Sequence, residues 1–223
     1  MSASHSDVPD RLRQVIGDSI EPVTPLRPPW KRLLAVLPLV LAAMAMPFAY
    51  NQLRDTGELG MMLAWVPVAI QVLLAFALLV FALREGIPGW RASSTKIFAS
   101  VLTAYVLQIV VNLLIFARAP MSSGGTVTMW MTCFRAESLI GLPALVLIAW
   151  LVARTLPQRP LVAGFLTGTG AGFAAEASWR MLCPYSDAAH VLMGHTGGIL
   201  VLGLTGFLLG YLWNLYAQET IAA

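Results

Sequence analysis

Residues 62–83 read MLAWVPVAIQVLLAFALLVFAL, a run of 22 positions without one charged side chain. An α-helix rises about 1.5 Å per residue, so this run is about 33 Å long, enough to cross a bilayer's hydrocarbon core of about 30 Å. Its side chains are apolar on every side, whereas a soluble helix keeps one polar face. The run therefore predicts a transmembrane helix.

The composition of the whole chain agrees with this run. Of its 223 residues, 58% are hydrophobic and only 11% are charged, and the mean hydropathy is +0.75. Soluble domains carry about 25% charged residues to cover their surface. This composition excludes a soluble enzyme, a disordered tail protein and a disulfide-dense secreted module. The formal net charge of +3 comes from scattered residues, so it also excludes a nucleic-acid binder that works by charge.

Six runs of this kind follow one another, separated by short segments that contain charged, proline or glycine residues. They cover Leu33–Tyr50, Met62–Leu83, Phe98–Phe116, Ser138–Ala153, Leu161–Leu182 and Val191–Tyr216. A β-barrel would instead show short segments with alternating polar and apolar residues. The sequence predicts an all-α polytopic membrane protein with about six transmembrane helices. Residues 31–223 form this helical domain, and residues 1–30 form a polar tail.

The distribution of basic residues predicts the orientation of the helices. With a cytoplasmic N-terminus, ten of the 14 Lys and Arg residues fall in cytoplasmic segments and four fall on the other side. Cytoplasmic loops of membrane proteins carry an excess of Lys and Arg. Both termini are therefore expected in the cytoplasm, with three short loops outside.

The tail contains one amphipathic segment, from Asp10 to Ile20. Apolar residues recur at helical spacing along it, and they form one stripe: Leu12, Val15, Ile16 and Ile20. Four prolines between Pro22 and Pro29 then favour an extended, stiff connection to the first membrane helix. Periodicity alone leaves two interpretations open, a helix that docks onto a soluble cytoplasmic protein and a helix that lies on the lipid surface.

The chain has two cysteines, and the predicted topology puts both on the non-cytoplasmic side. Cys133 is expected in the loop before the fourth span, and Cys183 follows the fifth. His190 and His195 lie a little further on, near the outer end of the last span. The thiols can form a disulfide in an oxidising compartment, stay as inert buried groups, or join the two histidines in binding a soft metal ion such as Zn²⁺ or Cu⁺.

Two further patterns lie in the fifth and sixth spans. Glu176 and Arg180 are four residues apart and are expected to form an ion pair near the outer interface, where Arg135 and Glu137 add to a polar cluster. Glycines recur every fourth residue on both spans, at Gly164, Gly168 and Gly172 and again at Gly206 and Gly210. Such spacing lets helix backbones approach closely, so these two helices are predicted to pack tightly.

The chain carries no motif for catalysis, so no enzyme activity is predicted. Three uncharged polar residues lie within the spans and are expected to bridge helices: Gln71, Gln108 and Asn112. A small-molecule or metal-ion transporter of the inner membrane is an alternative function, although no inverted repeat or charged mid-membrane site supports it.

Several features together resemble one known family. They are the Pro22–Pro29 stretch PVTPLRPP, six spans, Cys133 before the fourth span, RPLVAG at residues 159–164, Cys183-Pro184, and His195 with the glycines of the last span. This set resembles the negative regulator of sigma F family, which consists of anti-sigma factors of the bacterial inner membrane. The resemblance covers nearly the whole chain and is best from Cys133 to Gly210.

The resemblance implies a function. The tail would sequester an extracytoplasmic-function (ECF) sigma factor through Leu12, Val15, Ile16 and Ile20, and a periplasmic metal or redox stress sensed by Cys133 and Cys183 would release it. No resident cofactor is implied beyond a transient metal ion at the two cysteines. The partners are the sigma factor and the lipid bilayer, with no direct contact to nucleic acid. Glu176 and Arg180 are not features of the family.

Overall fold

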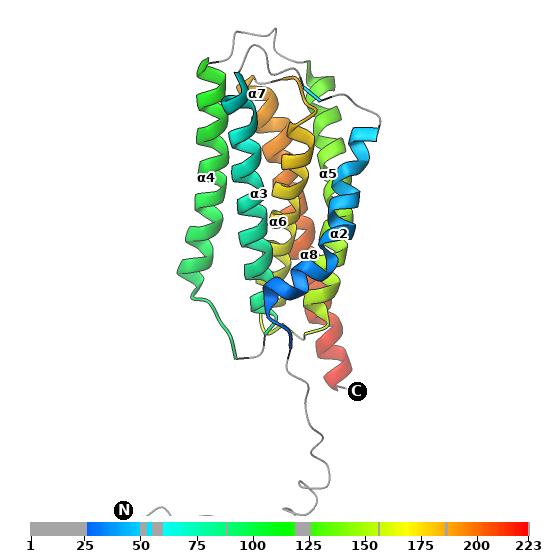
Figure 1. Ribbon diagram of the computed structural model, residues 1–223. Helices are drawn as coiled ribbons and strands as arrows, with labels where there is room; N and C mark the ends of the chain where they lie inside the picture. The colour runs from blue at the N-terminus through cyan, green and yellow to red at the C-terminus, as the bar shows by residue number, and fades with distance from the viewer. Residues whose placement is uncertain are drawn as a thin grey trace, which may run out of the picture.

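The computed structural model describes residues 26–49, 53–54, 60–87, 89–118, 126–155, 157–185 and 187–222. These residues form a bundle of long helices (Figure 1) without any β-strand in the described ranges, which confirms the predicted all-α class. The elements are α2 (Pro29–Ala45), η1 (Met46–Ala49), α3 (Gly60–Glu85), α4 (Ser94–Arg118), α5 (Val127–Ala153), α6 (Pro160–Arg180), α7 (Ala188–His190), η2 (Val191–Thr196) and α8 (Gly197–Ala222).

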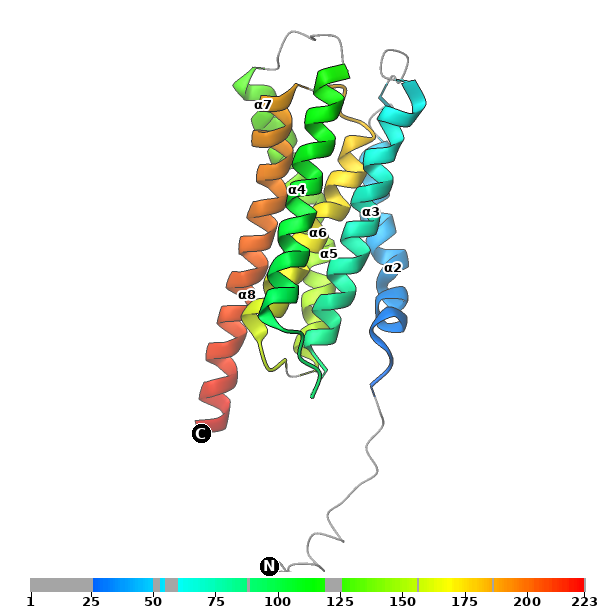
Figure 2. The ribbon, with the colours of Figure 1, turned by 90° about the vertical axis from the view of Figure 1, so that its left-hand side faces the viewer.

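The first turn of α2 and the last turn of α8 lie at the same end of the bundle, as Figures 1 and 2 both show. We call this the proximal end and the opposite one, where α7 lies, the distal end. The predicted amphipathic segment and its apolar stripe (Leu12, Val15, Ile16, Ile20) precede α2 and lie outside the described residues.

Five of the helical segments are long and apolar enough to cross a membrane: Pro29–Ala49, Gly60–Glu85, Ser94–Arg118, Val127–Ala153 and Ala188–Ala217. They correspond to five of the six predicted spans. The fifth predicted span is α6, which has 21 residues, among them four glycines, two threonines and the charged residues Glu176 and Arg180. Its crossing of the membrane stays a prediction, which its position among the other helices supports (Figure 2).

Helix α6 is the most enclosed element of the bundle, because α3, α5 and α8 all pack against it. Most of its residues are buried, including Phe173 and Leu166. The predicted close packing of α6 and α8 is confirmed. A Cβ atom added to Gly168 would lie 2.0 Å from the carbonyl oxygen of Leu202, and one added to Gly206 would lie 2.2 Å from the carbonyl oxygen of Gly164. No larger residue fits between these backbones.

Buried polar side chains connect the helices at the proximal end. Arg32, at the start of α2, donates to the carbonyl oxygens of Leu83 at 3.5 Å and Leu151 at 2.5 Å, which lie near the C-terminal ends of α3 and α5. The last carbonyls of a helix generally have no partner within it, and the partial negative charge at a helix C-terminus favours a cation there. Nearby, Glu85 forms an ion pair with Arg159, whose guanidinium also donates to the carbonyl oxygen of Ala92.

Candidate metal centre at the distal end

The two cysteines lie close together at the distal end, from different elements. Cys133 belongs to α5 and Cys183 follows α6; both are free and buried thiols, and their Sγ atoms are 3.8 Å apart. The prediction that Cys133 lies in a loop was wrong, because α5 begins at Val127 rather than at Ser138. The helix extends through Arg135 and Glu137, whose charges suggested a loop.

Two histidines complete the cluster. The Nε2 atom of His190 is 3.3 Å from Cys183 Sγ and 3.2 Å from the Nε2 atom of His195, and both rings are fully buried. In an α-helix, residues five positions apart point about 140° away from each other. Here the chain forms a π-helical turn, η2, in which hydrogen bonds run between residues five apart. The wider turn therefore brings both rings toward the same side.

These four side chains fit a soft metal ion. A tetrahedral site with metal–sulfur bonds of about 2.3 Å and metal–nitrogen bonds of about 2.0 Å has about 3.8 Å between its sulfurs and about 3.3 Å between its nitrogens. The Sγ–Sγ distance of 3.8 Å and the Nε2–Nε2 distance of 3.2 Å match these values. One donor atom from each of the four residues lies within 4.8 Å of all the others. Two thiolates with two imidazoles suit Zn²⁺, Cu⁺ or heavier relatives.

A cavity of about 280 Å³ adjoins the thiols on the distal side. Its walls include both cysteines together with the aromatic side chains of Trp179 and Tyr185. A hydrogen bond to the neighbouring Cys133 sulfur and, to a smaller extent, burial raise the pKa of the Cys183 thiol. The cavity therefore borders both cysteines, although the two residues themselves are buried.

Glu176 does not form the predicted ion pair with Arg180. Its Oε2 atom instead lies 2.5 Å from Nδ1 of His195, and the Arg180 guanidinium donates to the carbonyl oxygen of Tyr185 at 3.1 Å. No ion pair between Glu176 and Arg180 occurs among the residues that the structure describes. The spacing of four residues permits that pair, but the histidine on η2 offers Glu176 a closer partner.

Four buried charged side chains surround the cluster. Glu137 and Glu176 are fully buried carboxylates, while Arg54 and Arg180 are 6% and 1% exposed. Burial, together with repulsion from Arg180, lowers the pKa of Arg54 to about 10. Two carboxyl groups and two guanidinium groups therefore lie around the thiols in the interior of the bundle. Arg135, which was expected in this polar cluster, is exposed instead.

The mid-span polar residues act as predicted in two cases of three. Gln71 of α3 donates to Gln108 of α4 at 2.9 Å, so these side chains bridge two helices. Asn112 donates to the backbone carbonyl of Gln108 in its own helix at 2.7 Å. Sequence reasoning missed that both glutamines also reach Glu176, because their common partner lies more than 60 residues further along the chain.

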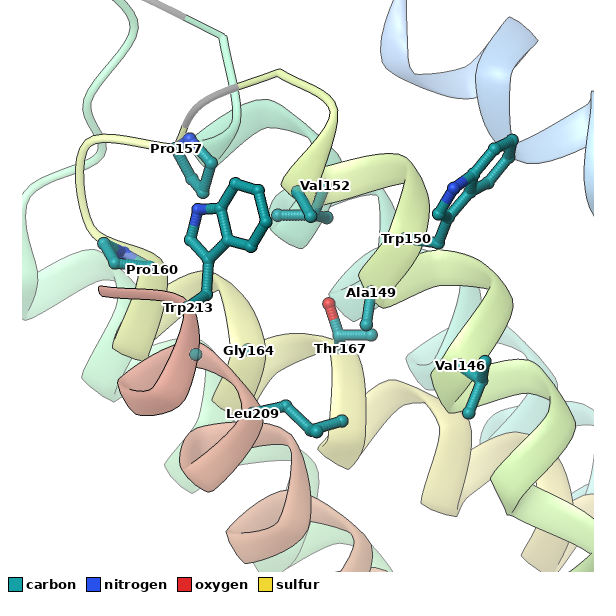
Figure 3. A pocket seen from close by; sticks show the side chains of 12 residues that line it. Val146, Ala149, Trp150, Val152, Pro157, Pro160, Gly164, Thr167, Leu209 and Trp213 are labelled. Carbon is teal, nitrogen blue, oxygen red and sulfur yellow. The ribbon is translucent and has the colours of Figure 1, made fainter. Parts of the chain in front are cut away.

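A second hollow, at the proximal end, has a different character. It holds about 270 Å³ between α5, α6 and α8, and Figure 3 shows mainly apolar side chains around it, among them Trp213, Leu209 and Val146. Its one side-chain hydroxyl, from Thr167, is already bonded to the carbonyl oxygen of Ala163. The hollow therefore offers a ligand almost only apolar contacts, unlike the distal cluster.

Comparison with known proteins identifies the family. The sequence model described as "Negative regulator of sigma F" matches residues 17–213. The chain is 28% identical over 210 residues to "Anti-sigma-F factor NrsF" of Caulobacter vibrioides (strain NA1000 / CB15N), which covers 90% of this chain and 94% of that protein. No solved structure matches the chain. The chain therefore belongs to the negative regulator of sigma F family, whose members are regulatory anti-sigma factors that bind a sigma factor and are not enzymes.

Proposed function

We propose that this chain resides in a bacterial inner membrane and holds an ECF sigma factor with its tail, residues 1–30. A metal ion or an oxidant that reaches Cys133 and Cys183 from the periplasm releases the sigma factor. The observation that carries this proposal is the converging set of two thiols and two imidazoles, buried and spaced for one soft ion. Family membership supports the sigma factor as partner and disfavours the transporter alternative.

The arrangement of the bundle supports a signal that crosses the membrane. The cluster lies at the distal end, whereas the tail joins α2 at the proximal end (Figure 1). Arg32, Glu85 and Arg159 lie at the proximal end, where Arg84 in the last turn of α3 and Arg91 and Arg154 in connecting segments add three more basic side chains. This concentration of basic residues supports a cytoplasmic proximal end and a periplasmic cluster.

Helix α2 supplies a direct connection between the two ends. Near its distal end the carbonyl oxygen of Met44 accepts a hydrogen bond of 2.6 Å from Ser178, a residue of α6 five positions before Cys183. At its proximal end Arg32 binds the carbonyl oxygens of α3 and α5. A shift of α6 relative to α5 would therefore move α2, which is bonded to both, and change the position of the tail that precedes it.

Either signal can change the relation of these elements. A metal ion that bonds to all four side chains ties α5, the segment after α6, and η2 to one point and fixes the spacing that their donor atoms already have. A two-electron oxidant such as hypochlorous acid would join the two sulfurs, which lose two electrons to it and two protons to solvent. Only about 1–3 kcal/mol of difference in tail affinity between the two states is needed for a five- to hundredfold change in sigma-factor release.

A charge within the apolar stripe tests the tail. Val15→Asp or Ile16→Asp should weaken sigma-factor binding by at least about a hundredfold, because the interface would bury an unpaired carboxylate. The full-length protein is co-purified with each ECF sigma factor of the same genome, expressed one at a time. Gln14→Asp is the matched control: it adds the same charge on the opposite side of the predicted helix, and should change binding by less than about threefold. Retention of the sigma factor by both stripe variants would exclude this docking surface.

The connection through α2 is tested at Arg32. Arg32→Gln removes the guanidinium that binds the ends of α3 and α5, so α2 loses these two hydrogen bonds at the proximal end. We expect transcription from a sigma-dependent promoter to rise about two- to tenfold without any signal. Lys31→Gln is the control, since the Lys31 side chain is exposed and its one described interaction is with the neighbouring Trp30 ring. If basal transcription in Arg32→Gln were no higher than in Lys31→Gln, α2 would not transmit the signal in the way proposed.

A further inference from the structure

A chain of buried hydrogen bonds leads from α3 and α4 to the cluster of two cysteines and two histidines. The amide groups of Gln71 and Gln108 both donate to one oxygen of Glu176, Oε1, at 3.0 and 3.1 Å. All three side chains are at most 2% exposed. A carboxylate buried to this extent is costly unless its oxygens accept hydrogen bonds. Side chains from two helices, α3 and α4, thus hold the Oε1 atom of Glu176 in place.

The other carboxylate oxygen of Glu176 determines the state of His195. Oε2 lies 2.5 Å from His195 Nδ1, and because an ionised carboxylate only accepts hydrogen bonds, the proton is on Nδ1. The second ring nitrogen, Nε2, then points toward His190 Nε2 at 3.2 Å, within the cluster. A neutral imidazole protonated at Nδ1 carries its lone pair on Nε2, the atom that would bind a metal ion.

From this geometry we propose that Glu176 is a positioning residue for metal recognition. It fixes the Nδ1–H tautomer and the ring orientation of His195, so that Nε2 faces the ion that Cys133, Cys183 and His190 also bind. This inference rests on the proposed metal signal and names the residue that prepares the site for it. A hydrogen bond from a histidine ligand to a carboxylate raises the basicity of the ligand, and its loss typically costs 10–100-fold in metal affinity.

The chain offers a matched control in Glu137. Its carboxylate is as buried as that of Glu176 and approaches the same His195 Nδ1 atom, but only to 3.5 Å. This distance is too long for an N–H···O hydrogen bond, and neither Glu137 oxygen has a hydrogen-bond partner among the described residues. Replacement of either glutamate by glutamine removes one buried carboxyl group beside the ring, but only at residue 176 does it break the hydrogen-bonded chain.

The test uses the full-length, reduced protein in detergent and Co²⁺ as the probe. Cobalt absorbs visible light when it is bound in a tetrahedral site and shows a sulfur-to-metal charge-transfer band when it is bound to thiolates. Glu176→Gln should weaken Co²⁺ binding by 10–100-fold and alter the visible bands, since an amide cannot accept hydrogen bonds at both ends. Glu137→Gln should change the affinity by less than about threefold and leave the bands as they are.

The outcomes separate this inference from the proposed function. A wild-type protein that binds no Co²⁺ with thiolate absorption would overturn the metal signal and with it this inference, but would leave the oxidant signal and the binding of the sigma factor standing. Binding by the wild type with equal affinity in Glu176→Gln would overturn the positioning role alone. Where Glu176→Gln fails to fold, Gln108→Met decides the question: it removes one of two donors to Glu176 and should weaken Co²⁺ binding about three- to tenfold, and an unchanged affinity would contradict the inference.

Discussion

Replacement of either Cys133 or Cys183 with serine should abolish the response to metal or oxidant while the sigma factor stays bound in unstressed cells. Each thiol supplies one of four donor atoms, and a serine hydroxyl is a poor ligand for a soft ion. We expect metal affinity to fall by at least about a hundredfold, since a four-ligand structural site contributes about 10–16 kcal/mol in total. Serine is only slightly smaller than cysteine, so the bundle should keep its fold.

Sigma-dependent reporter transcription, measured with and without added metal, checks this expectation. The double variant should be as unresponsive as either single variant. One missing thiol already destroys the site, so the two effects are not additive. Thr132→Ser is a suitable control, since Thr132 lines the same cavity and bonds only to the Thr128 carbonyl among the described hydrogen bonds. If metal still induced reporter transcription fully in both single serine variants, the thiols would have no part in the mechanism.

The second large effect is expected at the contact of α6 and α8. Gly168→Leu should destabilise the protein by more than about 3 kcal/mol, beyond the usual cost of an overpacked core. A Cβ at this position would lie only 2.0 Å from the carbonyl oxygen of Leu202, and backbone atoms cannot turn away as a flexible side chain does. The two helices would have to separate along their length.

The effect is measured as a lower midpoint of thermal unfolding in detergent. Size-exclusion chromatography checks whether the variant still elutes as a single symmetrical peak. Gly197→Ala is the control at the start of α8: its added Cβ would meet the Phe134 ring at 3.5 Å, an ordinary van der Waals distance. This variant should unfold within about 2 °C of the wild type, as expected for a substitution that costs only a few tenths of a kcal/mol. Equal stability of Gly168→Leu would mean that α6 and α8 do not pack as closely as described.

Most of the bundle could be predicted from hydropathy, and the errors have physical causes. The third span was expected at 98–116 and extends over Ser94–Arg118, a small difference at both ends. The largest error is the start of α5, because the charge of Glu137 suggests the end of a span. In the folded chain His195 and the other buried polar groups surround that carboxylate. Hydropathy counts each charge as if it faced lipid, so it shortens helices that bury charges inside a bundle.

The site was predictable in its residue types but not in its pairings. Soft donor atoms expected on one side of the membrane suffice to single out Cys133, Cys183, His190 and His195. The partner of Glu176 was not predictable, because the local rule favours Arg180 at four residues whereas the observed partner is 19 residues away. The π-helical turn that aligns the two histidines also has no signature in the sequence. The tail residues lie outside the described ranges, and their role stays a prediction.

The composition of α6 has a consequence for how the protein is made. A nascent helix passes from the translocation channel into lipid according to its own hydrophobicity, and α6 is not among the helices that are apolar enough by length and composition. Its glycine face matches α8, which the ribosome synthesises only afterwards. If α6 crosses the membrane as predicted, it has to stay beside the channel or against α3 and α5 until α8 is made, and a chain that ends before residue 197 is expected to be degraded by membrane quality control.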